Sequence, residues 1–251
     1  MIAAVLALVI VWLTTSPASA QAGGAAAQTR AGAQTGALPR MADGKPDFSG
    51  IWQVMNSAAS NLQDHPAEKG IPGGQSVVEG EIPYLASALA KKNENYRNRL
   101  TADSVAKCYA PGVPRITYMP FPFHILQTPT YMAFLYEYDH WVRHVYINSK
   151  HPAGPIEWWM GDSRAQWDGD TLVVDVTYFN DETWFDHAGN YHSTALHLVE
   201  RYSFIDRDHL NYEVTVEDSK VFSRPWKMSM PIYRRLEKNI QVLDYECHSF
   251  E

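Results

Sequence analysis

The sequence lacks clustered positive charge and the short motifs of nucleotide-binding enzymes and serine hydrolases. Lysine and arginine number 21 against 28 acidic residues, which gives a net charge of -7 with histidine neutral. Because nucleic acids are bound through clustered cations, we expect no nucleic-acid partner. The sequence has no G-x-S-x-G, no G-x-x-x-x-G-K-[ST] and no G-x-G-x-x-G, so we expect neither nucleotide chemistry nor an organic cofactor.

Long apolar runs are also scarce, and the one that exists lies at the start of the chain. Residues 2–13 are almost all apolar, and residues 18–20 (Ala-Ser-Ala) follow as a small-x-small site for signal peptidase. No Lys or Arg precedes the run, which is atypical of a signal. The run is shorter than the roughly 20 apolar residues of a membrane-spanning helix. We predict a signal peptide at residues 1–20 and an exported protein, periplasmic or secreted, without membrane contact after cleavage.

Composition divides the rest of the chain into two parts. Residues 21–45 are predicted to be a disordered tether, because a segment rich in Ala, Gly, Gln and Thr buries too little apolar surface to offset its ordering entropy. Residues 46–251 are predicted to be a single β-barrel domain, long enough to build a core. The 14 Tyr, 9 Phe and 8 Trp supply large side chains for that core.

Cysteine is limited to Cys108 and Cys247. Exported compartments are oxidising, and two cysteines allow a single intramolecular pairing, so a disulfide between them is predicted. Two buried free thiols are the alternative. A bridge would contribute about 4–5 kcal/mol in the chain-entropy model.

Apolar residues recur with the period of strands through most of the domain. Residues 47–54 are predicted to form a short first strand, and residues 83–99 a helix with one apolar stripe. From residue 115 onward the pattern is that of strands. Three hairpins are predicted there, with turns at residues 168–169, 206–208 and 238–239. The last hairpin would pair residues 232–236 with residues 240–245.

This order of elements predicts a mainly β fold of about eight to ten strands, with a helical excursion near the N-terminus. No crossover helices separate the later strands, so the sheet is expected to be antiparallel. A closed or nearly closed barrel removes the exposed edges of such a sheet and fits the strand count. A two-sheet β-sandwich is the alternative.

Several segments resemble a group of uncharacterised exported bacterial proteins. They are residues 43–52 (DGKPDFSGIW), 106–115 (AKCYAPGVPR), 167–174 (WDGDTLVV) and 179–201. The resemblance covers most of the domain and implies export, but no activity. Residues 50–52 (Gly-Ile-Trp) also resemble the Gly-x-Trp opening of lipocalin-like (calycin-type) barrels, which implies a barrel that holds a cavity. The long gap and the helix after the first strand depart from an ordinary lipocalin.

Histidines and carboxylates are dense between residues 180 and 201. Asp186, His192, His197 and Glu200 are candidates for a general acid–base set, since histidine titrates near neutral pH and a carboxylate orients it. The alternative places Asp186 in a turn. On a strand, His197 and Glu200 would point to opposite faces because their separation is odd, so they share a cavity only if a bulge intervenes.

The same residues are also candidates for a metal site. His192, His197 and Asp186 are suitable zinc ligands, but their spacing matches no H-E-x-x-H motif, and no paired cysteine ligands occur. We therefore predict no metal.

Two arginines are candidates for ligand binding. Arg143 alternates in step with apolar residues 145 and 147, and Arg234 lies between apolar residues 232 and 236. A charge on the dry face of a strand needs a partner, either a ligand carboxylate or an internal acid. The alternative is that both strands turn their other face inward and leave the arginines in water.

Aromatic residues supply the remaining ligand candidates. Tyr118 and His124 belong to a strip in which residues 120 and 122 are prolines, which places the strip at an edge or rim. Trp184 lies among the candidate acid–base residues. The other tryptophan candidates, Trp141 and the pair at 158–159, can stack on a sugar or an aromatic ring, although aromatic pairs are more often ordinary core.

Three functions are compatible with this pattern. The first is a small-molecule enzyme with an acid–base site in the barrel cavity, of isomerase, dehydratase or lyase type. The second is a non-catalytic, lipocalin-like binder of a small apolar or aromatic ligand. The third is a carbohydrate-binding surface of exposed tryptophans. Fold alone does not decide among them.

Overall fold

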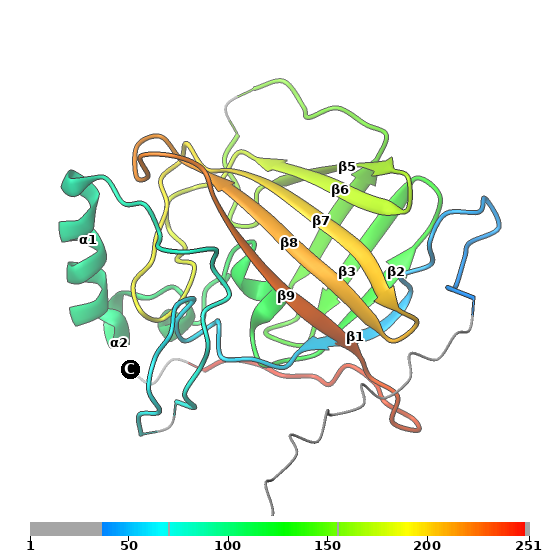
Figure 1. Cartoon of the computed structure of the whole chain (residues 1–251), viewed down its shortest axis with the longest axis horizontal. Helices are drawn as coiled ribbons and strands as arrows, with labels where there is room; N and C mark the ends of the chain where they lie inside the picture. The colour runs from blue at the N-terminus through cyan, green and yellow to red at the C-terminus, as the bar shows by residue number, and fades with distance from the viewer. Residues whose placement is uncertain (1–36, 70, 155, 249–251) are drawn as a thin grey trace, which may run out of the picture. The chain divides into compact units, whose positions relative to one another are not determined.

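The computed structural model describes residues 37–69, 71–154 and 156–248. The predicted signal peptide and residues 21–36 of the predicted tether lie outside the described residues. The described residues form nine strands that close into one barrel in chain order, with β1 pairing both β2 and β9 (Figure 1). The strands are β1 (Gly50–Val54), β2 (Phe123–Gln127), β3 (Tyr131–Tyr136), β4 (Val142–Ile147), β5 (Asp162–Asp168), β6 (Thr171–Thr177), β7 (His197–Asp206), β8 (His209–Glu217) and β9 (Trp226–Arg234). The predicted mainly β barrel is confirmed.

Two of the predicted hairpins are present. β5 and β6 are joined at Gly169, which has a positive φ of 60°, the conformation that a tight Asp-Gly turn requires. β7 and β8 form the second hairpin, with a bulge between Phe204 and Asp206. In β8 every second residue is buried, as expected for a strand with one face toward the core.

The expectation of a wholly antiparallel sheet is wrong at one pair of strands. β4 and β5 run parallel, and their ladder joins Val145 to Ser163 and Ile147 to Ala165. A parallel pair needs a crossover connection of about a dozen residues or more, usually a helix. Here the described residues of that connection, 148–154 and 156–161, contain no helix, so the sequence showed no sign of a crossover.

The predicted last hairpin is also wrong. β9 ends at Arg234, and residues 235–248 form no strand. The ring of Tyr245 lies 4.7 Å from that of Phe121 and 5.7 Å from that of Tyr138, and a single parallel bridge joins Tyr245 to Tyr138. These contacts draw the C-terminal segment away from β9 and across the segments that flank β2 and β3.

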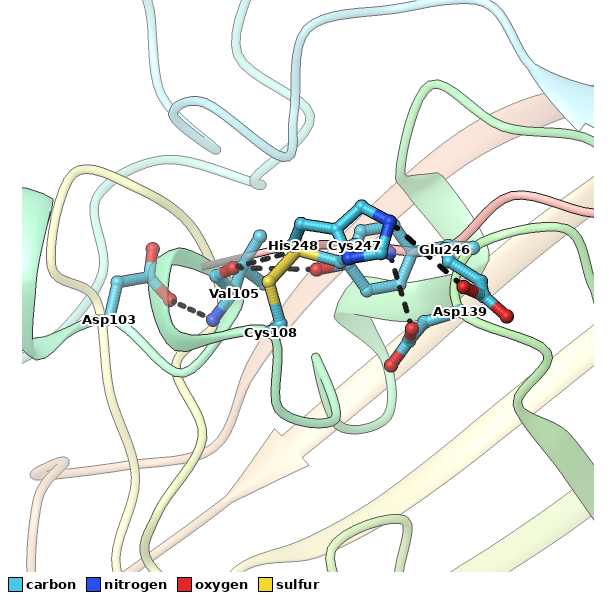
Figure 2. The surroundings of a disulfide bond; sticks show 8 residues. Asp103, Val105, Cys108, Asp139, Glu246, Cys247 and His248 are labelled. Atoms are coloured by element: carbon cyan, nitrogen blue, oxygen red, sulfur yellow. Dashed lines mark hydrogen bonds and ion pairs between the residues drawn. A yellow bond between two sulfur atoms is a disulfide. The ribbon is translucent and has the colours of Figure 1, made fainter. Parts of the chain in front are cut away.

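A disulfide anchors this C-terminal segment. Cys108 and Cys247 are bonded, with their Cα atoms 5.3 Å apart, which confirms the predicted pairing (Figure 2). The backbone N–H of Cys247 donates to the carboxylate of Asp139 at 3.3 Å. Cys108 follows the short 3-10 helix η1 (Val105–Lys107), so the bond ties the C-terminal segment to the long connection between β1 and β2.

The helices precede β2. The predicted helix is observed as α1 (Ala86–Arg97), followed by α2 (Arg99–Ala102), η1 and a second 3-10 helix, η2 (Arg115–Tyr118). α1 packs on the loop between β6 and β7. Asn95 Nδ2 donates to the carbonyl of Gly189, and a Cβ at Gly189 would lie 2.7 Å from the carbonyl oxygen of Lys92, so only glycine fits.

Large side chains fill the barrel interior. The inward positions carry fully buried residues from opposite walls, among them Trp52, Phe123, Phe134, Tyr202 and Tyr212. Burying such a side chain contributes about 1.5–3 kcal/mol relative to leaving it in water. The interior is therefore a packed core, and a ligand site has to be sought where the wall is interrupted.

Candidate functional site

A buried ion pair crosses the barrel interior. Arg143 on β4 and Glu200 on β7 form two hydrogen bonds, one of 3.1 Å between Nη1 and Oε1 and one between Nη2 and Oε2. Arg143 Nε donates to Ser163 Oγ on β5 at 3.0 Å. Arg143 is 2% exposed and Glu200 is 0% exposed. From the sequence, the partner of an inward Arg143 could be a ligand carboxylate or an internal acid. In the structure it is an internal acid, Glu200.

Two tyrosines complete this network. The Tyr212 hydroxyl donates to Glu200 Oε1 at 2.5 Å, and the Tyr202 hydroxyl donates to the same oxygen at 3.3 Å. Burial and the charge of Glu200 raise the pKa of both tyrosines well above the usual value, so they stay neutral donors. Burial alone would lower the pKa of Arg143, but Glu200 raises it well above its usual value. The positive charge inside the barrel is compensated without a ligand.

A pocket of about 450 Å³ opens beside this pair, where β4 and β5 diverge. The β4–β5 ladder begins at Val145, so the first residues of β4, including Arg143, are not paired with β5. The gap lets Arg143 and Ser163 reach the pocket from the interior. We call this hollow the Trp pocket, and its apolar lining consists of Trp141, Val142, Tyr146, Pro152, Trp158, Trp159 and Met160.

Backbone and aromatic contacts fix the two adjacent tryptophans of the Trp pocket. The N–H of Trp158 donates to the carbonyl of Tyr178 at 2.8 Å, and its carbonyl accepts from the N–H of Asn180 at 3.1 Å. The ring of Trp159 meets that of Tyr109 edge to face, with centroids 5.5 Å apart. Tyr109 follows the disulfide-bonded Cys108, so the disulfide lies next to the residue that supports this wall. Trp158 keeps 37% of its surface exposed.

The charged groups at the rim of the Trp pocket have partners. Arg164 donates through Nε and Nη2 to Asp162, both at 2.7 Å, and its guanidinium lies 4.6 Å from the ring centroid of Tyr146. His144 Nδ1 lies 2.5 Å from the Tyr131 hydroxyl. With Arg143 bound to its internal acid, each arginine that lines the pocket faces a carboxylate.

A second hollow of about 610 Å³ lies between β1, β9 and residues 72–77. Its lining contains no charged and no aromatic side chain. It therefore offers neither a flat ring for stacking nor a charge that would orient a ligand, and the smaller Trp pocket is the better candidate.

The four predicted acid–base residues lie in separate places. His197 begins β7 and is on the outer wall, whereas Glu200 on the same strand points inward, as their odd separation predicts. His197 Nε2 lies 2.7 Å from Asp175, and its Nδ1 lies 3.3 Å from Glu217. Among the described residues, no hydrogen bond joins any of the four to another.

His192 is buried in the loop between β6 and β7. Its Nδ1 lies 3.0 Å from the carbonyl of Ser193, which can only accept, so Nδ1 carries the proton and Nε2 accepts from the Thr183 hydroxyl at 2.8 Å. The ring packs against Phe179 and Phe185. Burial lowers the pKa of His192, which favours the neutral form. Its contacts are those of a packed core histidine.

Asp186 joins two loops. Its carboxylate accepts from the N–H of Leu62 at 2.9 Å, from the N–H of Asn190 at 3.1 Å and from Asn190 Nδ2 at 2.6 Å. It is completely buried, and this burial raises its pKa. The side chain links the loop that contains Leu62 to the loop between β6 and β7.

Of the five predicted ligand contacts, only Arg143 lines the Trp pocket. The Tyr118 hydroxyl donates to the carbonyl of Phe185 at 2.8 Å, and Trp184 is 7% exposed. His124 is half-buried on β2, and burial lowers its pKa.

Arg234, the last of these candidates, lies at the end of β9. Its guanidinium lies 4.1 Å from the ring centroid of Trp52, and Nη1 donates to the carbonyl of Ser49 at 2.8 Å. It therefore lies on the inward face of β9, directly opposite Trp52 on β1, and its partners at the end of the barrel include the carboxylate of Asp208 at 3.5 Å.

Four residues of the Trp pocket were not predicted from the sequence: Tyr146, Asp162, Ser163 and Arg164. On β5 the first three residues are all polar, and nothing in this pattern shows that the strand borders a gap in the wall. Within the described part of the chain, no group of three or more His, Cys, Asp and Glu side chains is arranged to hold a metal ion. None of the described helices is long and apolar enough to cross a membrane.

Comparison with known proteins adds no family to this description. No protein-family model matches the chain, and no curated protein matches it. The Trp pocket and the ion pair behind it are therefore the features from which a function can be inferred.

Proposed function

We propose that the protein binds a small, uncharged molecule with an aromatic or other apolar ring in the Trp pocket. The observation that carries this proposal is the lining of the pocket, in which Trp141, Trp158, Trp159 and Tyr146 surround about 450 Å³ beside a buried polar network. Ligand sites in proteins are typically concave, of about 300–1,000 Å³, mostly apolar and oriented by a few polar groups.

The charge balance of the pocket supports an uncharged ligand. Arg143 is bound to Glu200, and Arg164 is bound to Asp162. A carboxylate ligand would have to displace one of these acids or lose its own hydration without gaining an unpaired cation, and both cost free energy. A neutral ring loses little hydration and gains contact with the tryptophans.

Binding is better supported than acid–base catalysis. Asp186, His192, His197 and Glu200 do not converge on one cavity, and none of the four lines the Trp pocket. His192 and Asp186 have their hydrogen-bonding atoms occupied by neighbouring loops. The geometry gives a substrate no access to a histidine–carboxylate pair among these residues.

We also infer that the protein acts outside the cytoplasm. The support is the predicted signal peptide at residues 1–20 together with the Cys108–Cys247 disulfide, because disulfides persist in oxidising compartments. Expression with residues 1–20 in place, followed by mass measurement of the exported protein, tests this inference. The expected product begins at Gln21 and is two hydrogens lighter than the reduced chain.

A pair of fluorescent probes tests the proposed ligand class. N-phenylnaphthylamine is uncharged, whereas anilinonaphthalene sulfonate has the same rings and an added anion. We expect the uncharged probe to bind at least about tenfold more tightly at moderate salt, which corresponds to about 1.4 kcal/mol. Equal affinity for the two probes, or tighter binding of the sulfonate, would overturn the proposal of an uncharged ligand.

A further inference from the structure

A chain of alternating charges runs along the outer wall of the barrel, next to the Trp pocket. It crosses four strands and the β4–β5 connection, and each member lies within 3.3 Å of the next. In order, its members are Glu217 on β8, His197 on β7, Asp175 on β6, His151 in the β4–β5 connection, and Asp162 and Arg164 on β5.

The two histidines of this chain are placed to carry a proton on both ring nitrogens. His151 Nδ1 lies 2.6 Å from Asp162 Oδ2, and His151 Nε2 lies 2.8 Å from Asp175 Oδ1. A neutral imidazole has one donor and one acceptor, so a ring that faces two carboxylates satisfies both only as the imidazolium. His197 has the same arrangement between Asp175 and Glu217.

The remaining groups around His151 carry little charge. The Thr177 hydroxyl lies 3.4 Å from Nδ1, and the Tyr178 ring meets the imidazole edge to face at 5.9 Å. Lys150 and Arg164 line the same surface groove, and Arg164 is bound to Asp162. Around His197, the charged groups are Asp175 and Glu217. Without the two imidazolium charges, three carboxylates would face one bound arginine.

This chain shares residues with the wall of the Trp pocket. Asp162 and Arg164 line the pocket, and Pro152, which follows His151, lines it from the connection. His151 is held to the barrel by Asp162 and Asp175, and the side chain is 24% exposed. Release of His151 would therefore free Pro152 and disturb the partners of Asp162 on the same side of the pocket.

We propose that this chain of charges holds the wall of the Trp pocket in place and that His197, coupled to the wall through Asp175 and His151, makes it sensitive to pH. The ligand is then bound more tightly at mildly acidic pH and is released as the pH rises. The inference rests on the proposed function and adds its regulation. Histidine is suited to the role because its charge changes between about pH 5 and 8.

The direction of this pH dependence follows from the contacts of His197. Its hydrogen bond to Asp175 raises the pKa of His197, and Glu217 adds to the effect. The form in which His197 is charged and bound to both carboxylates is therefore fully populated at low pH. It is lost as the pH rises through this raised pKa. A neutral imidazole would present a nitrogen lone pair to one of its two carboxylates, and the attraction between the ring and that carboxylate would be lost.

The test measures binding of N-phenylnaphthylamine at about pH 5.5 and about pH 8. For the unmodified protein we expect affinity at least about fivefold weaker at the higher pH, the lower end of ordinary coupling between sites. His151→Gln should bind with nearly the same affinity at both values. His209→Gln is the matched control, because His209 pairs with a carboxylate of Asp206 at the β7–β8 turn and should retain the full dependence.

A ligand-free readout separates this inference from the proposed function. Fluorotryptophan incorporated into the protein gives fluorine NMR signals, assigned with Trp158→Phe and Trp159→Phe. We expect these two signals to shift between about pH 5.5 and about pH 8 in the unmodified protein and not in His151→Gln, in which the chain between His197 and the pocket wall is broken. Shifts without probe binding would overturn the proposed function alone. Probe binding with no pH dependence, or with the same pH dependence in His151→Gln, would overturn the proposal that this chain of charges regulates the pocket.

Discussion

Arg143 and Glu200 are 57 residues apart in the sequence and form a bidentate ion pair across the barrel interior, between strands that are not neighbours. A buried pair of this kind contributes little net stability, because desolvation offsets the attraction. The pair instead fixes the position of the start of β4, where β4 is not yet paired with β5. This places Arg143 at the base of the Trp pocket.

Removal of one partner of this pair should be costly. We expect Glu200→Gln to lower the free energy of unfolding by about 3–5 kcal/mol, because the charge of Arg143 would be buried without compensation. Glu213→Gln on β8 is the control. Its ion pair with Lys227 is on the outer wall, and its loss should cost less than about 1 kcal/mol. Urea unfolding measures both, and equal losses would contradict the role given to Glu200.

Asp186 is expected to be a structural residue. Its oxygens accept from three N–H groups, so Asp186→Asn would place an amide NH2 against a donor and lower the free energy of unfolding by about 1–3 kcal/mol. Chemical denaturation measures this loss. A variant with unchanged stability would instead support a functional role for the carboxylate.

Acid stability should depend on Asp103. Burial alone would raise its pKa, but Arg115 and His187 lower the pKa of Asp103 to about 2. The pKa is thus depressed in the folded state. Its contribution of about 2–3 kcal/mol is present above about pH 4 and is lost as the pH falls toward 2.

Urea unfolding as a function of pH tests this contribution. Asp103→Asn should be less stable at neutral pH and should lose less stability between pH 4 and 2 than the unmodified protein. Asp170→Asn is the control, because Asp170 pairs with Arg40 on an exposed surface. An Asp103→Asn profile parallel to that of the unmodified protein would refute the assignment.

The disulfide should stabilise both the fold and one wall of the Trp pocket. Cys108 and Cys247 are 139 residues apart, and in the chain-entropy model closing such a loop contributes up to about 5 kcal/mol. The double change Cys108→Ser and Cys247→Ser should lower the melting temperature. It should also loosen Tyr109, which supports Trp159, and so weaken probe binding. A variant that melts lower but binds the probe normally would separate the two effects.

Local patterns in the sequence were sufficient to predict much of the barrel. Alternation in β8 and the Asp-Gly turn before β6 are local signals, and both match the structure. The parallel β4–β5 pair and the course of the C-terminal segment were not predictable in this way. The first depends on a connection without a helix, and the second on contacts of Tyr245 with residues more than a hundred positions earlier.

The candidate site was predicted less well than the fold. Alternation with its neighbours made an inward Arg143 one of two alternatives. Its partner Glu200 was assigned to an acid–base set, because pairing across a barrel depends on register around the whole sheet. His192 and Asp186 were predicted as acid–base residues only because histidines and carboxylates are dense in that segment. Their neighbours in space, Thr183 and Leu62, show that the loops bury them as structural groups.

Titration of N-phenylnaphthylamine against Trp158→Ala tests the central claim most directly. Trp158 is 37% exposed in the Trp pocket, and Tyr96 on α1, which is 40% exposed, provides the matched control as Tyr96→Ala. We expect Trp158→Ala to bind the probe at least about tenfold more weakly than the unmodified protein, and Tyr96→Ala to bind it equally well. Unchanged binding by Trp158→Ala, with both variants folded, would contradict a ligand site in the Trp pocket.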